Sequence, residues 1–293
     1  MLQGNNMREI GTKVAMVDEE KFPEQRTFLV ADITYVLGHQ IARGGFSTVY
    51  KARDEWGNNL VAKVYNADVA PGMWRNEIEH YQRLRHPHIV RMYAGFELED
   101  QGHIILEYGG LGMGRVMVGS DEERRLLLPL VAKGMLEALH YMHQGGFVHT
   151  DINPGNVLLL LSPDNHPRVV KLCDLGLTMK DSDLVRGRHT AKWNPPPENL
   201  DARFGDLGPS MDIYSAALVL MELLLGEELT RFSEEEIFSG APQHRALEVG
   251  GTLGAALASA LSPQADKRVT AIELWRQIRK ASIGLKESEN NTV

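Results

Sequence analysis

The feature that most constrains the fold of this chain is a change of periodicity near residue 110. From about residue 34 to residue 108, short β-like runs alternate with turns, and one helical stretch interrupts them. Beyond residue 110 the pattern is helical, starting with a segment that opens on a capping-box spacing, Ser120 to Glu123, and stops at Gly145 and Gly146. Strands followed by helices are typical of α+β proteins. We therefore expect a small β-rich lobe followed by a larger, mainly helical lobe.

The expected boundaries divide the chain into four parts. Residues 1–30 form an N-terminal tail, residues 31–108 the β-rich lobe, residues 109–282 the helical lobe, and residues 283–293 a C-terminal tail. Both tails are polar and are expected to be loose, as chain termini often are. With 293 residues, of which 43% are hydrophobic, the chain can bury a sizeable core.

Charge and cysteine content narrow the classes of function. The formal net charge of -8 opposes nucleic-acid binding, because phosphate neutralisation needs clustered Lys and Arg. One cysteine, Cys173, excludes an internal disulfide and a cysteine-based zinc site, and it suits a reducing compartment. No apolar run approaches the roughly 18 to 20 residues of a membrane span, and residues 1–25 lack a signal-type apolar region. We expect a cytoplasmic protein that acts on small or protein substrates.

Two charged residues stand in apolar surroundings. The helical stretch "MWRNEIEHYQRLR" places four residues on one face: Met73, Glu77, Tyr81 and Leu84. An inward carboxylate needs a cationic partner, because burying an unpaired charge is costly. Lys63, central in the apolar strand "LVAKVY", has the same need with the opposite sign. Lys63 and Glu77 are therefore expected to pair, and the alternative is that Glu77 is an ordinary solvated glutamate.

The stretch "HTDINPGN", residues 149–156, precedes a predicted β-hairpin. Five apolar residues follow it, then the turn residues "SPDNHP", and then "VVKLC", which leads into Asp174. In an antiparallel pair, the residue before the first strand and the residue after the second strand lie at the same end. Asn156 and Asp174 are therefore expected to be neighbours, with Asp151 on the loop that leads into this end. Two carboxylates and an amide oxygen suit Mg²⁺, with one carboxylate left as a base. For this pattern alone, a hydrogen-bonded polar loop is the alternative.

The order of these motifs resembles that of the eukaryotic-type serine/threonine protein kinases over about residues 36–281. "IARGGFSTVY" resembles the Gly-rich loop over ATP phosphates, "VAKV" the strand of the phosphate-binding lysine, and "ILEY" the hinge. "HTDINPGN" is similar to the catalytic loop, and "DLG" at 174–176 to the metal-binding D-F-G motif. "PPE" at 196–198 resembles A-P-E, and Arg268 resembles the arginine that pairs with its glutamate, Glu198. The resemblance implies a two-lobed kinase fold.

The resemblance also implies a role for each part of the site. Asp151 would orient the acceptor hydroxyl and take its proton, and Lys63, held by Glu77, would bind the α and β phosphates. Asn156 and Asp174 would hold Mg²⁺. The implied nucleotide-binding residues are Ile41, Ala42, Gly44, Ser47, Val49, Val61, Lys63, Leu106, Glu107, Gly109 and Leu158. The expected cofactors are ATP and Mg²⁺, and the expected partner is a protein substrate.

The activation segment departs from the family pattern. Thr150 replaces the arginine of H-R-D, which makes the chain a non-RD variant with an H-T-D loop. Threonine cannot form the bidentate pair that arginine makes with phosphate. Activity is therefore expected to be largely independent of phosphorylation at Thr178, Ser182 or Thr190, unless another basic residue such as Arg186 or Arg188 reads the phosphate instead.

The phosphate site departs from the pattern as well. Asn153 stands where the family has a lysine that neutralises the γ-phosphate, and an amide can still donate a hydrogen bond there. This substitution predicts slow transfer unless Lys192 or another basic group reaches the phosphate. Ala42 and Ser47 fill two glycine positions of the Gly-rich loop, which predicts a stiffer loop that tolerates nucleotide.

An active protein kinase is the main interpretation, because the residues implied in phosphate and metal binding are intact. A pseudokinase that acts as a nucleotide-binding scaffold is one alternative, motivated by Asn153 and the depleted Gly-rich loop. A small-molecule kinase of related fold is another, because such enzymes share an H-x-D-x-x-P-x-N loop. Glu198, Asp212 and Arg268 in protein-kinase spacing favour a peptide-binding lobe. Asp212 itself either caps a helix or braces the catalytic loop.

Overall fold

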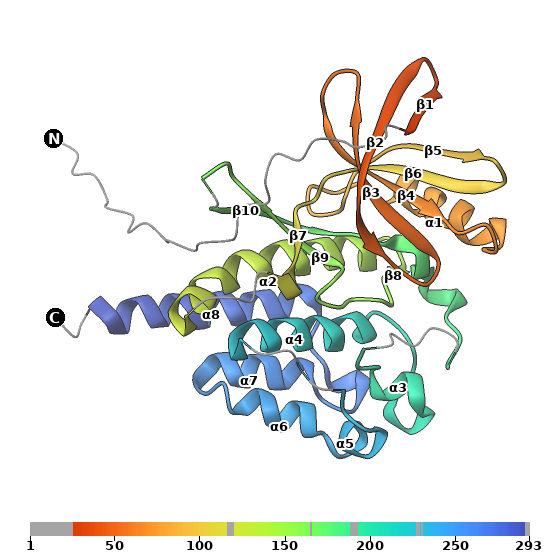
Figure 1. Cartoon of the computed structure of the whole chain (residues 1–293). Helices are drawn as coiled ribbons and strands as arrows, with labels where there is room; N and C mark the ends of the chain where they lie inside the picture. Colours follow the sequence, from red (N-terminus) through yellow and green to blue (C-terminus); the bar gives the residue numbers. More distant parts are fainter. Residues whose placement is uncertain are drawn as a thin grey trace, which may run out of the picture.

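The computed structural model describes residues 26–115, 120–164, 166–187, 193–226, 229 and 231–290. Figure 1 shows two parts of different character in this portion of the chain, one built of strands with a single helix and the other built mainly of helices. The predicted α+β architecture with two lobes is therefore confirmed.

The N-terminal lobe is an antiparallel sheet of six strands in the order β1-β2-β3-β4-β6-β5. The strands are β1 (Arg26–Val30), β2 (Ile33–Arg43), β3 (Ser47–Asp54), β4 (Asn59–Tyr65), β5 (Met92–Leu98) and β6 (Gln101–Glu107). Strand β4 lies in the middle of the sheet, between β3 and β6. Four consecutive β4 residues, Leu60 to Lys63, are buried, because both faces of this strand are covered. The central position of β4 explains how a lysine comes to be buried.

Helix α1 (Pro71–Arg83) packs against β5 and β6. Proline at the start of α1 fits the first turn, where no backbone N–H is needed. The prediction of which α1 residues face inward is wrong at one position. Trp74 is buried together with Glu77 and Tyr81, whereas Met73 is only half-buried. The large Trp74 ring takes the core position because it covers Gly102 of β6, where a Cβ would collide with the indole.

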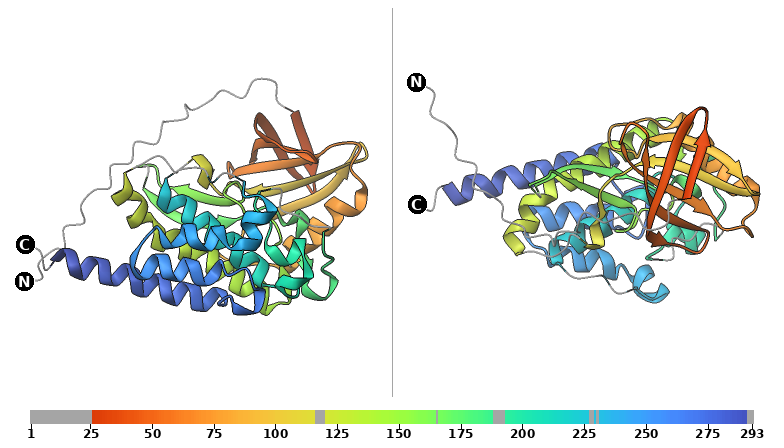
Figure 2. Two further views of the ribbon diagram at one scale, coloured as in Figure 1. Left: turned by 90° about the horizontal axis from the view of Figure 1, so that it is seen from below. Right: turned by 45° about the horizontal axis from the view of Figure 1, so that its top comes forward.

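The C-terminal lobe is built mainly of helices (Figure 1). Its helices are α2 (Asp121–Gln144), α3 (Pro197–Leu200), α4 (Ser210–Leu225), α5 (Glu234–Ser239), α6 (Ala241–Leu247), α7 (Gly251–Ala260) and α8 (Ala271–Asn290). The predicted capping box at the start of α2 is present, with Ser120 and Glu123 bonding reciprocally. Every residue of α4 from Met211 to Leu224 is buried, so this helix forms the centre of the lobe. Helix α8 lies along α2 and α7 (Figure 2).

The C-terminal lobe also contains short strands, and the first of them follows the segment that leads into this lobe from β6. They are β7 (Leu111–Gly112), β8 (Phe147–Val148), β9 (Val157–Leu161), β10 (Pro167–Leu172) and β11 (Met179–Lys180). Strands β9 and β10 form the predicted hairpin, with Val157 opposite Leu172. The Cys173 N–H donates to the Asn156 carbonyl at 3.0 Å, so Asn156 and the residues after β10 meet at one end of the hairpin.

Both predicted tails need correction. Residues 26–30, assigned to the N-terminal tail, form β1, because the Phe28 ring packs edge-on against His103 with ring centroids 5.2 Å apart. Residues 283–290, assigned to the C-terminal tail, continue α8, in keeping with the helix-forming Leu, Lys and Glu in that segment. Residues 1–25 and 291–293 lie outside the described residues. Among the helices that the structure describes, none is long and apolar enough to span a membrane.

Candidate active site

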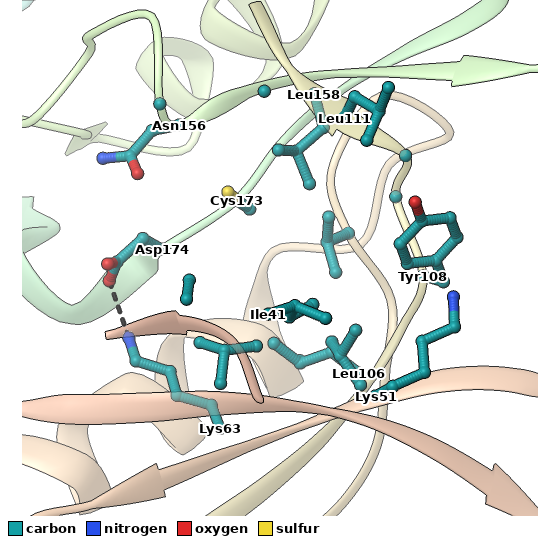
Figure 3. A pocket seen from close by; sticks show the side chains of 18 of the residues that line it. Ile41, Lys51, Lys63, Leu106, Tyr108, Leu111, Asn156, Leu158, Cys173 and Asp174 are labelled. Atoms are coloured by element: carbon teal, nitrogen blue, oxygen red, sulfur yellow. Dashed lines mark hydrogen bonds and ion pairs between the residues drawn. The ribbon is translucent and has the colours of Figure 1, made fainter. Parts of the chain in front are cut away.

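A cavity of about 880 Å³ lies between the two lobes (Figure 3). It is bounded by the turn between β2 and β3, by strand β4, by the segment after β6, and by the end of the β9–β10 hairpin where Asn156 and Cys173 meet. All of the residues predicted to bind nucleotide or metal line it: Ile41, Ala42, Gly44, Ser47, Val49, Val61, Lys63, Leu106, Glu107, Gly109, Asn156, Leu158 and Asp174. The fold thus brings residues from both lobes to one cavity.

One part of the cavity is an apolar slot. Figure 3 shows Leu106 and Leu158 pointing into it from opposite lobes. After β6 the chain crosses β9 so closely that a Cβ at Gly110 would collide with the Leu159 carbonyl, and Gly110 also has a φ of 104°. Only glycine fits this crossing without strain. An apolar slot next to exposed main chain is suited to a flat, partly polar ring.

The other part of the cavity carries a buried group of charges. The Lys63 ammonium lies 2.9 and 2.8 Å from the two Glu77 carboxylate oxygens and 2.8 Å from Asp174 Oδ1. The expected contact between Lys63 and Glu77 is therefore present. Glu77 has no exposed surface, whereas the Asp174 side chain is 43% exposed. We call these three residues the cleft group, and it combines one ammonium with two carboxylates.

Burial and charge act against each other on the pKa values of the cleft group. Burial lowers the pKa of Lys63, but Glu77 and Asp174 outweigh burial and hold this pKa well above its usual range. Burial raises the pKa of Glu77, and Lys63 only partly offsets this effect. Burial also raises the pKa of Asp174, but Lys63 outweighs it, so the net shift is downward. Lys63 and Asp174 are therefore charged at neutral pH.

The loop at residues 149–156 is held by Asp212, the third residue of α4. Its carboxylate accepts hydrogen bonds from the backbone N–H of His149 at 2.8 Å and of Thr150 at 2.9 Å. His143 contacts the same carboxylate at 2.9 Å. Of the two roles considered for Asp212, the geometry matches the loop brace. This brace supports Thr150 in a left-handed conformation with a φ of 66°, which is unusual for a β-branched residue.

Asp151 lies in this loop and is held by Asn156. The Asn156 side-chain amide donates to Asp151 Oδ2 and to the Asp151 carbonyl, each at 2.8 Å. Its amide oxygen is on the side of Asp174 in Figure 3. Burial raises the pKa of Asp151, and the nearby Asp174 charge acts in the same direction. A raised pKa strengthens a carboxylate as a base at neutral pH.

The Asn153 side chain bonds within its own loop. Its Oδ1 accepts from the Gly155 N–H at 2.9 Å, and its Nδ2 donates to the Asp151 carbonyl at 3.1 Å. Asparagine commonly closes turns in this way. Both groups of the amide therefore make contacts within the loop.

Residues 178–192 include the predicted phosphorylation sites and the basic residues that were considered as phosphate-binding groups. The Arg186 guanidinium donates to the carbonyl oxygens of Glu198 and Gly205. Thr178 is 3% exposed and so is not accessible as a phosphorylation site. The Thr150 hydroxyl donates to the Leu177 carbonyl at 2.6 Å. Arg188, Thr190 and Lys192 lie outside the described residues.

A magnesium ion fits the residues at the Asp174 end of the cavity. In the described part of the chain, no three His, Cys, Asp or Glu side chains are grouped as a metal cage. Mg²⁺ is, however, usually bound by one or two carboxylates together with substrate phosphates and water. The partly exposed Asp174 carboxylate and the Asn156 amide oxygen supply such ligands.

Two tyrosines of the site were missed by the sequence analysis. The Tyr65 hydroxyl donates to Glu77 Oε2, and the Tyr81 hydroxyl accepts from the Asp174 N–H at 3.1 Å. The signal for Tyr65 was its spacing of two from Lys63, which puts both on the same face of a strand. The signal for Tyr81 was its spacing of four from Glu77 on one helix face.

Residues 35–275 match the family model described as the protein kinase domain. This match covers most of the chain, so the chain belongs to the protein kinase family. The antiparallel sheet with one helix and the mainly helical second lobe are accordingly the kinase fold.

Several curated relatives are serine/threonine-protein kinases. The probable serine/threonine-protein kinase PknB of Bifidobacterium longum is 31% identical over 217 residues, which cover 66% of this chain and 30% of that protein. A probable serine/threonine-protein kinase of Streptomyces coelicolor, SCO3848, is 32% identical over 214 residues, or 65% and 30% of the two chains. The CBL-interacting protein kinase 4 of Oryza sativa is 33% identical over 213 residues, or 66% and 44%. The similarity thus spans less than half of the length of each of these relatives.

Proposed function

We propose that this chain is an ATP-dependent kinase that phosphorylates Ser or Thr hydroxyls of protein substrates. The observation that carries this proposal is the continuity of the cavity, in which the apolar slot at Leu158 leads to the ammonium of Lys63. A nucleoside triphosphate needs these two environments side by side, one for the base and one for the phosphates. The names of the relatives support serine and threonine as acceptors.

In this proposal the chain acts mainly by positioning groups. Lys63, oriented by Glu77, binds the α and β phosphates. Asp151, oriented by Asn156, accepts the proton of the acceptor hydroxyl as the hydroxyl oxygen bonds to the γ-phosphorus of ATP, and the bond from that phosphorus to the β–γ bridging oxygen breaks to release ADP. The brace from Asp212 fixes the loop that carries Asp151.

Asn156 and Asp174 would hold Mg²⁺ in this proposal. When bound, the ion supplies positive charge that neutralises the phosphates. The cleft group favours a cation at this position because its two carboxylates exceed its one ammonium in charge.

A nucleotide-binding scaffold is the second candidate. The observation that favours it is Asn153, which has no charge and spends both amide groups within the loop. Phosphoryl transfer would then lack a cation that the family usually provides. A scaffold would still bind nucleotide through the same cavity.

The deciding experiment compares wild type with Asp151→Asn and Asp174→Asn. Mg·ATP at 100 times its dissociation constant is expected to stabilise wild type and Asp151→Asn by about 2.7 kcal/mol, measured by thermal or urea unfolding. Asp174→Asn is expected to lose the Mg²⁺-dependent part of this stabilisation. With labelled ATP and a generic protein acceptor, Asp151→Asn should reduce transfer about 10²- to 10⁴-fold.

Other outcomes would select another function. Nucleotide binding by wild type without transfer to any acceptor would establish the scaffold. Transfer to small-molecule acceptors but not to proteins would establish a small-molecule kinase. A cytoplasmic location, suggested by the low cysteine content, is a further proposal, and its test is fractionation of cells that express the chain.

A further inference from the structure

Two buried tyrosines, Tyr65 and Tyr81, flank the cleft group. Tyr65 and Tyr81 are each 3% exposed. The Tyr65 hydroxyl donates to Glu77 Oε2, and its ring centroid lies 5.2 Å from the Lys63 ammonium. The Tyr81 hydroxyl accepts from the backbone N–H of Asp174 at 3.1 Å. Burial raises the pKa of both phenols, so both are neutral at physiological pH.

Asp174 needs external support for its backbone conformation. Its φ of 61° and ψ of 76° are uncommon for a residue other than glycine, and such conformations persist only when surrounding contacts hold them. One such contact is the hydrogen bond that the Asp174 N–H donates to the Tyr81 hydroxyl. The next residue, Leu175, accepts at its carbonyl oxygen from His80 Nδ1 at 3.1 Å. His80 and Tyr81 are consecutive in α1, so the last turn of this helix holds two consecutive residues of the segment.

The cleft group must rearrange when substrate binds, and this requirement gives the tyrosines a task. In the structure Lys63 contacts Glu77 and Asp174 at the same time. Phosphates would compete for the ammonium, and a cation would attract the Asp174 side chain. The Asp174 backbone would then lose the support that it receives through its own side chain and Lys63. Glu77, which has no exposed surface, would have to share Lys63 with the phosphates.

The contacts made by the tyrosines do not depend on the contact between Lys63 and Asp174. Tyr65 reaches Glu77 from β4, and Tyr81 reaches the Asp174 backbone from α1. Both contacts can persist while the two charged side chains exchange their mutual contact for substrate. Preorganised groups of this kind lower the cost of assembling a charged site.

We propose that Tyr65 and Tyr81 are positioning residues for phosphoryl transfer, Tyr65 by holding Glu77 and thereby Lys63, and Tyr81 by holding the backbone of Asp174. The inference rests on the proposed kinase function and extends it to these two hydroxyl groups. It assigns separate consequences to them, since Lys63 would bind nucleotide phosphates and Asp174 would bind the metal ion.

The test uses Tyr65→Phe and Tyr81→Phe, which remove one oxygen atom each and retain the rings. Tyr141→Phe is the matched control. The Tyr141 hydroxyl accepts a hydrogen bond of 3.2 Å from the Arg85 N–H, and Tyr141 does not line the cavity. Tyr81→Phe is expected to lower kcat about tenfold, as for the loss of one hydrogen bond, and to raise the Mg²⁺ concentration that gives half-maximal rate. Tyr65→Phe is expected to raise KM for ATP about tenfold on the same grounds. Tyr141→Phe should change neither constant.

The inference and the proposed function fail in different ways. If wild type transfers phosphate and Asp151→Asn does not, but both tyrosine variants keep the wild-type kcat, KM for ATP and Mg²⁺ dependence, the inference is wrong and the kinase function stands. If wild type transfers no phosphate, the kinase function is wrong, and nucleotide binding decides the inference. Unchanged Mg²⁺ dependence of ATP binding in Tyr81→Phe would then overturn it. Because Tyr81→Phe has its own readout, this test holds even if Tyr65→Phe does not fold.

Discussion

The helical lobe and the cleft each contain a buried ion-pair group, and the two differ in how completely their charges are matched. In the helical lobe, Arg268 pairs with Glu198 through two bonds of 2.6 and 2.7 Å, and neither side chain is exposed. The other donors of Arg268 bond to the carbonyl oxygens of Ser262, Ser210 and Pro263. One cation meets one anion here, and the guanidinium is surrounded by acceptors.

The cleft group is built differently. Lys63 faces two carboxylates, and the Asp174 side chain is 43% exposed to the cavity. A matched and enclosed pair fixes the packing of the elements that carry it. An unmatched charge at a cavity leaves an interaction for a ligand to complete. The comparison therefore predicts that the enclosed pair contributes mainly to stability and the cleft group mainly to ligand binding.

The largest expected effect is the loss of stability when the enclosed pair of Arg268 and Glu198 is broken. Arg268→Met leaves the Glu198 carboxylate buried without its cation, and the free energy of unfolding should fall by about 3–5 kcal/mol. Urea unfolding of the unliganded protein measures this loss. Arg203→Met is the control, because Arg203 forms an exposed pair with Asp201 and should cost less than about 1 kcal/mol. Equal losses in the two variants would contradict the role given to the enclosed pair.

The next largest effect is expected from Lys63→Met, which should change ligand binding more than stability. Lys63→Met should cost less stability than Arg268→Met, because Glu77, whose pKa is already raised by burial, can take up a proton. The same variant should lose the stabilisation of about 2.7 kcal/mol that Mg·ATP gives wild type at 100 times its dissociation constant. Paired urea titrations with and without Mg·ATP measure both quantities. If Lys63→Met lost as much stability as Arg268→Met and still bound nucleotide, the comparison would be reversed.

A smaller effect on turnover is expected from adding a cation to the loop that carries Asp151. Asn153→Lys should raise turnover about tenfold, because a charged donor replaces a neutral one, although it sacrifices the turn formed with Gly155. Asn153→Ala removes the same turn without adding charge and should lower turnover. Steady-state rates at saturating Mg·ATP distinguish the two. A fast wild type that is slowed by Asn153→Lys would show that the positive charge comes from another residue.

The smallest effect concerns pH and a buried histidine outside both groups. Burial lowers the pKa of His103 from 6.5, so the unfolded chain binds a proton that the folded chain does not. Stability should therefore fall as the pH falls below 6.5. His103→Phe, which keeps a ring beside Phe96, should reduce this slope between pH 7 and pH 5.5 in urea titrations. The difference between the two proteins isolates His103 from Glu77, whose raised pKa acts in the opposite direction, and identical slopes would contradict the prediction.

Features that depend on neighbouring residues were predictable from the sequence. The capping box at Ser120 follows from a spacing of three, and the β9–β10 hairpin follows from two apolar runs around a turn. The hairpin in turn places Asn156 beside Cys173, because antiparallel pairing fixes which ends meet. The contact of Lys63 with Glu77 could also be predicted, because two opposite charges in apolar surroundings have few other ways to be satisfied.

Features that depend on distant packing were not predictable. The Tyr81 hydroxyl accepts from the Asp174 N–H, which is 93 residues away in the sequence, and the Arg186 guanidinium donates to the carbonyl oxygens of Glu198 and Gly205. Sequence patterns show which side chains face inward, since periodicity is a local property of the chain. The atom that each hydrogen bond reaches is decided only when α1 packs against residues 174–177, because hydrogen bonds require distances and angles that the assembled lobes alone provide.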